Sequence, residues 1–187
     1  MNIYDFKTEY RRSPFGLTVK SPRFSWKMNA DKQNTVQNLY RIQVWNGTET
    51  VWDTGMKESS DSVLIPYAGK ELSSETVYHV KVTVWDNYGN ADSAEATFET
   101  GTFDPMQFQA EMITPDLPED ETACPVFWKD FQAEKPVKKA VVYATALGVY
   151  EMSLNGERIG ADRMTPGWTS YHKRLQYQEY DITSQIH

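Results

Sequence analysis

The sequence predicts an all-β fold, and three observations predict it. Two segments, 39–45 and 76–85, alternate between apolar and polar residues with the period of two that is typical of half-buried strands. Turn signals built from Gly, Pro, Asn and Asp recur along all 187 residues. No long stretch has the spacing of an amphipathic helix. The first half should hold about seven short strands, which is typical of a fibronectin type III-like or immunoglobulin-like sandwich.

The strands of the first half are expected to bury one face each. Besides 39–45 and 76–85, we expect strands at 23–28, 61–66 and 93–100. The residues expected to face the core are Tyr40, Ile42, Val44, Tyr78, Val80, Val82, Val84, Ala94, Ala96 and Phe98. Their spacing of two residues is what places them together on one side of a sheet.

The dipeptide Asn46-Gly47 predicts a β-hairpin, because it lies between alternating segments and both residues tolerate a positive φ. Asn46-Gly47-Thr48 also matches a glycosylation sequon. The turn is the preferred interpretation, since no secretion signal supports the sugar.

Tyr78 is predicted to have a structural role. Leu72, Thr76 and Tyr78 have the spacing of the fibronectin type III pattern that precedes its sixth strand. In that pattern the tyrosine hydroxyl bonds back to upstream backbone, an arrangement known as the tyrosine corner. The alternative is plain core packing, which is structural as well.

Glycine and proline interrupt the strand pattern within 99–105, which predicts a domain boundary. We therefore expect a fibronectin type III-like sandwich at 1–102 and a second domain at 103–187. The first part has 11 basic and 13 acidic residues, and the second has 8 and 13. Much of the acidic excess lies in 116–122, which we expect to be a solvated loop.

The second half is expected to be β as well. Its candidate strands are 126–132, 138–147, 149–155 and 175–182. Asn155-Gly156 predicts a further hairpin turn. Because strands and helices do not alternate, doubly wound folds and their nucleotide sites are excluded.

Composition argues against several classes of partner. The net charge of −7 is unfavourable for binding nucleic acid or an anionic membrane surface. No apolar run approaches the ~20 residues of a membrane span. The single cysteine, Cys124, excludes an internal disulfide and a cysteine-based zinc site. No signal peptide is visible, so a cytoplasmic location is favoured; a periplasmic or extracellular location would follow if the natural chain starts upstream.

No catalytic, metal or cofactor site is assigned from the sequence. It has no G-x-S-x-G elbow, no glycine-rich phosphate loop and no H-E-x-x-H. His79, His172 and His187 lie far apart. Glycosidase carboxylates are paired by a spatial distance of roughly 5 to 9.5 Å, so sequence spacing singles out none of them here.

Trp168 and Tyr171 are the candidate carbohydrate-binding residues. They lie in a predicted loop, PGWTSYHKR, together with Lys173 and Arg174. Aromatic rings in such a loop can stack on the C–H face of a sugar. The alternative is that the Trp168 side chain packs into the end of its own sandwich or against a neighbouring domain.

Several segments of the chain together resemble the N-terminal region of bacterial α-L-rhamnosidases. In order they are EYRRSPFGL (9–17) with PRFSW (22–26), VWDTG (51–55), VWDNYG (84–89) with FETG (98–101), ATALGVYEMSLNGERIG (144–160) and PGWTSYHKRLQYQEYDIT (166–183). Each motif alone is weak, but their order and spacing are specific and cover nearly the whole chain.

This resemblance implies a fibronectin type III-like domain followed by part of a jelly-roll β-sandwich often described as carbohydrate-binding. In the family these precede an (α/α)₆ barrel that hydrolyses terminal α-L-rhamnose with inversion. The catalytic acids of the barrel match no residue here, so none is carried over. Phe108 and Met112 stand where tryptophans are common in the family. Residues 103–187 correspond to about half of the jelly-roll domain, so the chain is expected to be a truncated fragment.

Two functions follow as hypotheses. The favoured one is an accessory fragment of an α-L-rhamnosidase that is catalytically inactive and acts as a scaffold or presents sugar. Its expected partners are the catalytic barrel of the same protein and a rhamnose-containing carbohydrate, with self-association through unpaired strands. The alternative is a free-standing carbohydrate-binding or adhesion module of tandem β-sandwiches. An open reading frame encoding a barrel downstream would distinguish the two.

Overall fold

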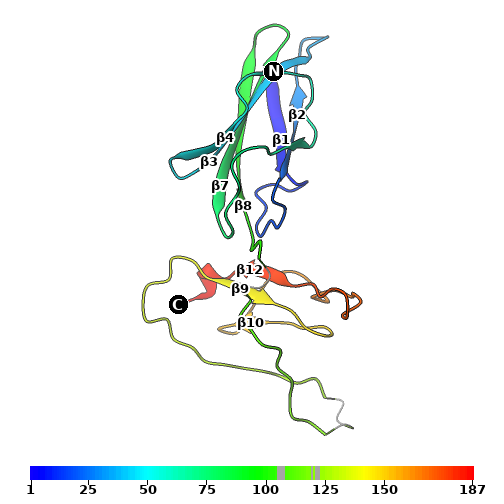
Figure 1. Ribbon diagram of the computed structural model, residues 1–187, viewed down its shortest axis with the longest axis vertical. Coiled ribbons are helices and arrows are strands. Elements are labelled where there is room, and N and C mark those ends of the chain that lie inside the picture. Colours follow the sequence, from blue (N-terminus) through cyan, green and yellow to red (C-terminus); the bar gives the residue numbers. More distant parts are fainter. Residues whose placement is uncertain (105–107, 119, 121–122) are drawn as a thin grey trace. The chain divides into compact units, whose positions relative to one another are not determined.

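A computed structural model describes residues 1–104, 108–118, 120 and 123–187 (Figure 1). The chain divides into two compact units, Met1–Phe108 and Gln109–His187, each of which is described by itself. Both units are built of strands, so the predicted all-β fold class is confirmed. The helical content of the described residues is a single 3-10 turn, η2 (Thr183–Gln185). No helix in this part of the chain is long and apolar enough to cross a membrane.

Unit 1 contains two antiparallel sheets (Figure 1). The smaller sheet has the strand order β1-β2-β6, and the larger has the order β4-β3-β7-β8 with β5 paired to β3. The strands are β1 (Asn2–Thr8), β2 (Arg23–Asn29), β3 (Gln37–Asn46), β4 (Glu49–Asp53), β5 (Lys57–Glu58), β6 (Ile65–Pro66), β7 (Val77–Asp86) and β8 (Ala91–Glu99). This is the sandwich that the sequence predicts for the first half.

The core of unit 1 comes from alternate residues of these strands. In the register of β3 with β7, Ile42 lies opposite Val82 and Val44 lies opposite Val80. The buried apolar residues are Ile3, Phe6, Phe24, Trp26, Ile42, Val44, Tyr67, Leu72, Tyr78, Val80, Val82, Val84 and Phe98. The remaining predicted core residues, Tyr40, Ala94 and Ala96, are partly buried against this cluster. The period of two therefore identified the inner face correctly.

A buried amide connects the two sheets of unit 1. The side chain of Gln37 accepts a hydrogen bond from Trp26 Nε1 at 2.9 Å. Its Nε2 donates to the carbonyl oxygens of Ser59 and Asp61 at 3.0 and 2.8 Å. Gln37 is thus a buried polar side chain with its hydrogen-bonding groups paired, as burial requires.

The predicted hairpin at Asn46-Gly47 is confirmed, with one difference. Asn46 still pairs with Glu49 as the last residue of the ladder, so the loop consists of Gly47 and Thr48. Only Gly47 has a positive φ, +54°. The second predicted hairpin, at Asn155-Gly156, has positive φ at both residues, 51° and 82°.

Unit 2 holds two short antiparallel pairs (Figure 1). The first joins β9 (Val141–Ala144) to β12 (Gln178–Asp181), and the second joins β10 (Ser153–Leu154) to β11 (Glu157–Arg158). The strands predicted at 138–147, 149–155 and 175–182 are therefore present, but each is shorter than the alternation suggests.

The prediction of a strand at 126–132 is wrong. The structure describes 123–140 as irregular backbone, and no residue from 124 to 137 forms a hydrogen bond with another described residue. A strand exists only when a neighbour pairs with its backbone groups, and none lies beside this segment in the described residues. Parts of two other predictions, Pro105 in the boundary and Glu119 with 121–122 in the acidic loop, lie outside the described residues.

Candidate functional site

The segment 165–174 forms a surface loop, here called the Trp168 loop, that carries both predicted carbohydrate-binding residues. It begins with a cis peptide bond between Thr165 and Pro166. Gly167 follows with φ +102°, and a Cβ atom there would lie 2.6 Å from Gln176 Oε1. The positive φ is what favours glycine here, since the Gln176 amide lies at the end of a flexible side chain that can move away from a Cβ.

Two long-range interactions fix the start of the loop. Tyr150 N–H donates to the Thr165 carbonyl at 2.9 Å, and Thr165 Oγ1 donates to the Tyr150 carbonyl at 3.0 Å. Gln178, in β12, donates from Nε2 to the Pro166 carbonyl at 3.0 Å. The hydroxyl of Tyr150 lies 2.9 Å from Gln178 Oε1 and donates to it. Tyr150 and Gln178 therefore hold the stem through one connected hydrogen-bond network.

The tip of the loop is closed by a tight turn. Backbone N–H groups of Lys173 and Arg174 both donate to the Ser170 carbonyl, at 2.8 and 2.9 Å. Thr169 Oγ1 donates to the Arg174 carbonyl at 2.5 Å. The backbone that carries Trp168 is thus fixed at the stem and at the tip.

Trp168 itself is 94% exposed, so its indole contributes nothing to the packing of unit 2. Tyr171 is half-buried, and among the described residues no ring contact joins it to Trp168. An exposed tryptophan on a well-hydrogen-bonded loop is unusual, because this residue is highly buried on average. Tryptophan is enriched at interfaces, because its ring is apolar while its N–H can still form a hydrogen bond.

A second network supports the region next to the loop. The hydroxyl of Tyr180 donates to Asp162 Oδ2 at 2.9 Å. Burial and this hydrogen bond raise the pKa of Tyr180, and burial raises the pKa of Tyr150. Both phenols therefore remain protonated donors at neutral pH. The ring of Tyr180 lies so close to Gly160 that an added Cβ would overlap its Cε1 atom.

The described carboxyl groups with a shifted pKa do not suit the general acid of a glycosidase. A glycosidase needs one carboxyl group with a raised pKa to act as the general acid. Six described carboxyl groups have a pKa that is shifted downward, because cations or hydrogen-bond donors favour the charged form. These groups are Asp5, Glu9, Glu49, Asp53, Asp86 and Asp181. Nor do three or more metal-ligating side chains come together among the residues described.

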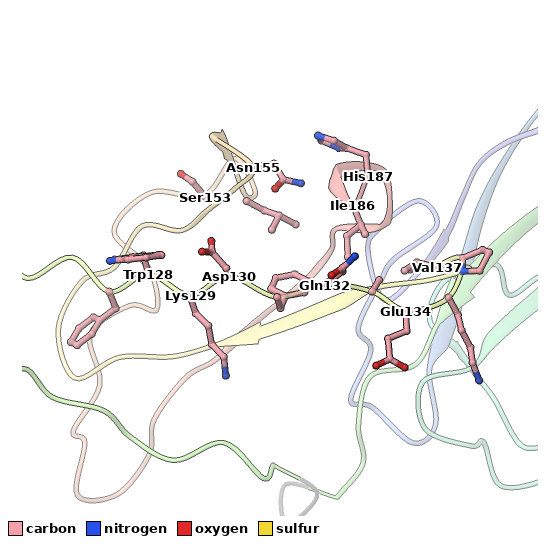
Figure 2. A pocket seen from close by; sticks show the side chains of 16 residues that line it. Trp128, Lys129, Asp130, Gln132, Glu134, Val137, Ser153, Asn155, Ile186 and His187 are labelled. Atoms are coloured by element: carbon pink, nitrogen blue, oxygen red, sulfur yellow. The ribbon is translucent and has the colours of Figure 1, made fainter.

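Unit 2 also contains an open hollow of about 900 Å³ between the segment 127–137 and the β10–β11 hairpin. Figure 2 shows Asp130 and Gln132 on one side, with Asn155 and His187 across from them. Trp128 lies at one end and is 81% exposed. Because the segment 124–137 is not held by hydrogen bonds to described residues, this hollow is not a preorganised ligand site.

The residues that position Trp168 were missed at the sequence level. Tyr150 and Gln178 lie at sequence separations of 15 and 12 residues from their partners in the stem, so local periodicity cannot find them. The sequence does contain two signals for the loop itself. Thr-Pro-Gly indicates a constrained turn, and a pair of adjacent cations has no acidic neighbour.

Two family models match the chain. The description "Rha78A-like, N-terminal immunoglobulin domain" applies to residues 3–104. The description "Alpha-L-rhamnosidase N-terminal domain" applies to residues 135–187, which include the Trp168 loop.

Curated relatives and solved structures agree with these matches. An α-L-rhamnosidase of Alteromonas sp. (strain LOR) is 34% identical over 93% of this chain and 21% of its own length. One from Formosa agariphila is 30% identical over 94% and 22%. The structure titled α-L-rhamnosidase from Dictyoglumus thermophilum superimposes with a TM-score of 0.88 at 35% identity, covering 99% of this chain and 24% of that one. The chain therefore spans between a fifth and a quarter of the length of these relatives.

Proposed function

The chain belongs to the α-L-rhamnosidase family, whose N-terminal region it matches, and we propose that it is a non-catalytic accessory region that presents rhamnose-containing glycans to a catalytic domain. Most of the length of the relatives lies outside the matched region. We place the hydrolysis of terminal α-L-rhamnose in that remaining part. The lowered pKa of each of the six shifted carboxyl groups described above supports this division, since none of them is suited to act as a general acid.

The observation that carries the sugar-presenting role is the exposure of Trp168. Its indole is 94% exposed, while hydrogen bonds from Tyr150 and Gln178 hold the loop that carries it. A flat apolar ring that is already oriented loses little conformational freedom when a sugar stacks on it. Tyr171, three residues away and half-buried, supplies a second aromatic side chain in the same loop.

Binding to the 187-residue chain tests this proposal. We would titrate it by calorimetry with an oligosaccharide that ends in α-L-rhamnose, and compare Trp168→Ala with the unchanged chain. Truncating a central aromatic contact commonly costs more than ~2 kcal/mol, so binding should weaken by a factor of about 30 or more. Tyr171→Ala should weaken binding by a smaller factor.

Trp128→Ala is the matched control, because Trp128 is also an exposed tryptophan of unit 2 but lies outside the loop. It should bind as the unchanged chain does. Equal affinity of Trp168→Ala and Trp128→Ala, or no binding by the unchanged chain, would overturn the sugar-presenting role.

A further inference from the structure

We infer that the Trp168 loop selects a sugar unit that carries an anionic group, a carboxylate or a sulfate. This inference rests on the sugar contact proposed above and adds a chemical class to it. It is carried by the charge of the loop, by the lack of partners for that charge, and by the turn that holds the cations close to Trp168.

The loop is basic within an acidic protein. Its ten residues, 165–174, include Lys173 and Arg174 and contain no Asp or Glu. The chain as a whole has a net charge of −7. An anionic ligand is therefore repelled by the average surface of this protein and attracted at this loop.

These two cations are not used by the fold. Both side chains are exposed, and neither forms an ion pair with a carboxylate that the structure describes. Several other arginines of the chain, though not Arg11 or Arg163, pair with described carboxylates: Arg23 pairs with Glu9 at 2.6 Å, and Arg41 pairs with Asp53 at 2.5 Å. In unit 2, Arg158 pairs with Glu151 at 3.2 Å.

The turn at the tip of the loop holds the backbone of Lys173 and Arg174 close to the residues that follow Trp168. Lys173 and Arg174 both bond back to Ser170, and the Thr169 hydroxyl bonds to the Arg174 carbonyl. Thr169 directly follows Trp168, so the indole and the guanidinium are attached to two arms of one closed turn. Their backbone positions are fixed relative to each other before any ligand arrives.

A charged sugar presents the complementary pair of features. One face of a pyranose ring carries C–H groups that pack on an indole, and a carboxylate or sulfate extends from the ring edge. Arginine binds such oxyanions with two parallel N–H···O hydrogen bonds, and lysine adds a point charge. A neutral sugar would use only the indole and leave both cations in water.

A pair of ligands that differ only in charge tests this inference. The acidic ligand is an oligosaccharide of alternating rhamnose and galacturonate, and the neutral one is the same oligosaccharide with its carboxylates reduced to primary alcohols. A sulfated rhamnose oligosaccharide distinguishes sulfate from carboxylate. Two exposed ion pairs should make the 187-residue chain bind the acidic form about tenfold more tightly, and added salt should reduce that preference.

Variants assign the preference to the loop. The double substitution Lys173→Gln/Arg174→Gln should remove the preference and leave affinity for the neutral form unchanged. Lys129→Gln/Lys135→Gln changes the net charge by the same amount at exposed positions of unit 2 outside the loop, and it should retain most of the preference. Trp168→Ala should weaken binding of both forms.

The outcomes separate this inference from the function it rests on. Equal affinity for the acidic and neutral forms, both sensitive to Trp168→Ala, would overturn the anionic selection and retain the sugar contact. A preference that survives the loop double substitution but is lost in the control would also overturn it. If neither form binds the unchanged chain, the sugar-presenting function fails together with this inference.

Discussion

The hydroxyl of Tyr78 accepts a hydrogen bond from the backbone N–H of Ser73, five residues upstream, at 2.9 Å. The tyrosine is buried, and its ring stacks on Phe98 with centroids 5.3 Å apart. The predicted tyrosine corner is therefore present, and it fixes the chain just before β7. Thr76, which completes the predicted pattern, donates from Oγ1 to the Ser74 carbonyl at 2.8 Å.

Tyr78→Phe should lower the free energy of unfolding of unit 1 by about 1 kcal/mol, because it removes the partly buried hydrogen bond between the Ser73 N–H and the Tyr78 hydroxyl. Urea denaturation followed by circular dichroism measures the change. Tyr40→Phe is the control, since the Tyr40 side chain is only partly buried at the edge of the same core. A Tyr78→Phe protein as stable as the parent would contradict a structural role for this hydroxyl.

The 187-residue chain should not hydrolyse an aryl α-L-rhamnoside. The six described carboxyl groups with a shifted pKa all favour the charged form, whereas inverting hydrolysis needs a protonated acid opposite a second carboxylate. Release of the aryl chromophore above a buffer blank is the measurement. Turnover by protein free of contaminating enzyme would show that catalysis does not need the rest of a family member.

Acid should destabilise unit 1 partly through Asp53. Arg41 donates to both oxygens of this carboxylate, at 2.9 and 2.5 Å, and lowers the pKa of Asp53 from 3.8 to about 2. In the unfolded chain the group regains its ordinary pKa, so the unfolded state binds more protons as the pH falls from about 4 to 2. The stabilisation by this pair is therefore complete above pH 4 and is lost toward pH 2.

Asp53→Asn should flatten that part of the dependence of unfolding free energy on pH. Asp31→Asn, at an exposed position, should leave the slope as it is in the parent. An unchanged slope in Asp53→Asn would mean that the ion pair is too well screened by solvent to contribute.

Gly160→Ala should destabilise unit 2 more than Gly156→Ala does. Both glycines have positive φ, 72° and 82°, so each substitution costs roughly 1 kcal/mol in backbone strain. At Gly156 a Cβ has no atom within 4 Å, whereas at Gly160 it would overlap the ring of Tyr180. The added overlap should also displace the Tyr180 hydroxyl from Asp162. Limited proteolysis of unit 2 measures the difference, and equal cleavage rates would argue against this contact.

The chain should self-associate through the segment 126–132. Val126, Trp128 and Phe131 are exposed there, and its backbone makes no hydrogen bonds to described residues. Exposed apolar segments whose backbone groups are unpaired can pair with another chain. Light scattering at rising concentration should show an increasing mass, and Trp128→Lys/Phe131→Lys should prevent the increase. Val63→Lys, at an exposed position of unit 1, is the control.

A parent chain that remains monomeric at millimolar concentration, with a unit 2 that resists protease, would show that this unit is self-sufficient. The same result would remove the reason for expecting unpaired strands to act as an interface.

The sequence predicted unit 1 better than unit 2, and the cause is physical. The alternation in 76–85 coincides with a strand that has neighbours on both sides, β3 and β8, so local preference and long-range pairing agree. The segment 126–132 is rich in residues that favour strands but does not alternate, and a strand also needs a partner, which local sequence does not encode. The same limit applies to the loop stem: a Thr-Pro-Gly turn is visible in sequence, whereas its contacts with Gln178 are not.

The exposure of Trp168 could not be read from its identity, because tryptophan is more often buried than exposed. The charged residues that follow it in the sequence are the better indication that the loop is exposed. Lys173 and Arg174 lie in a stretch, 163–178, that contains no acidic residue, and the structure leaves both cations in solvent.

The six tryptophans of the chain are divided between very different surroundings. Trp26 of unit 1 is 2% exposed and hydrogen-bonded to Gln37, whereas both tryptophans of unit 2, Trp128 and Trp168, are largely exposed. Fluorescence emitted at short wavelength should therefore come mainly from unit 1, and emission at long wavelength mainly from unit 2. Acrylamide should quench the long-wavelength component first. The melting of each unit and the occupation of the Trp168 loop can thus be followed separately in one unlabelled sample.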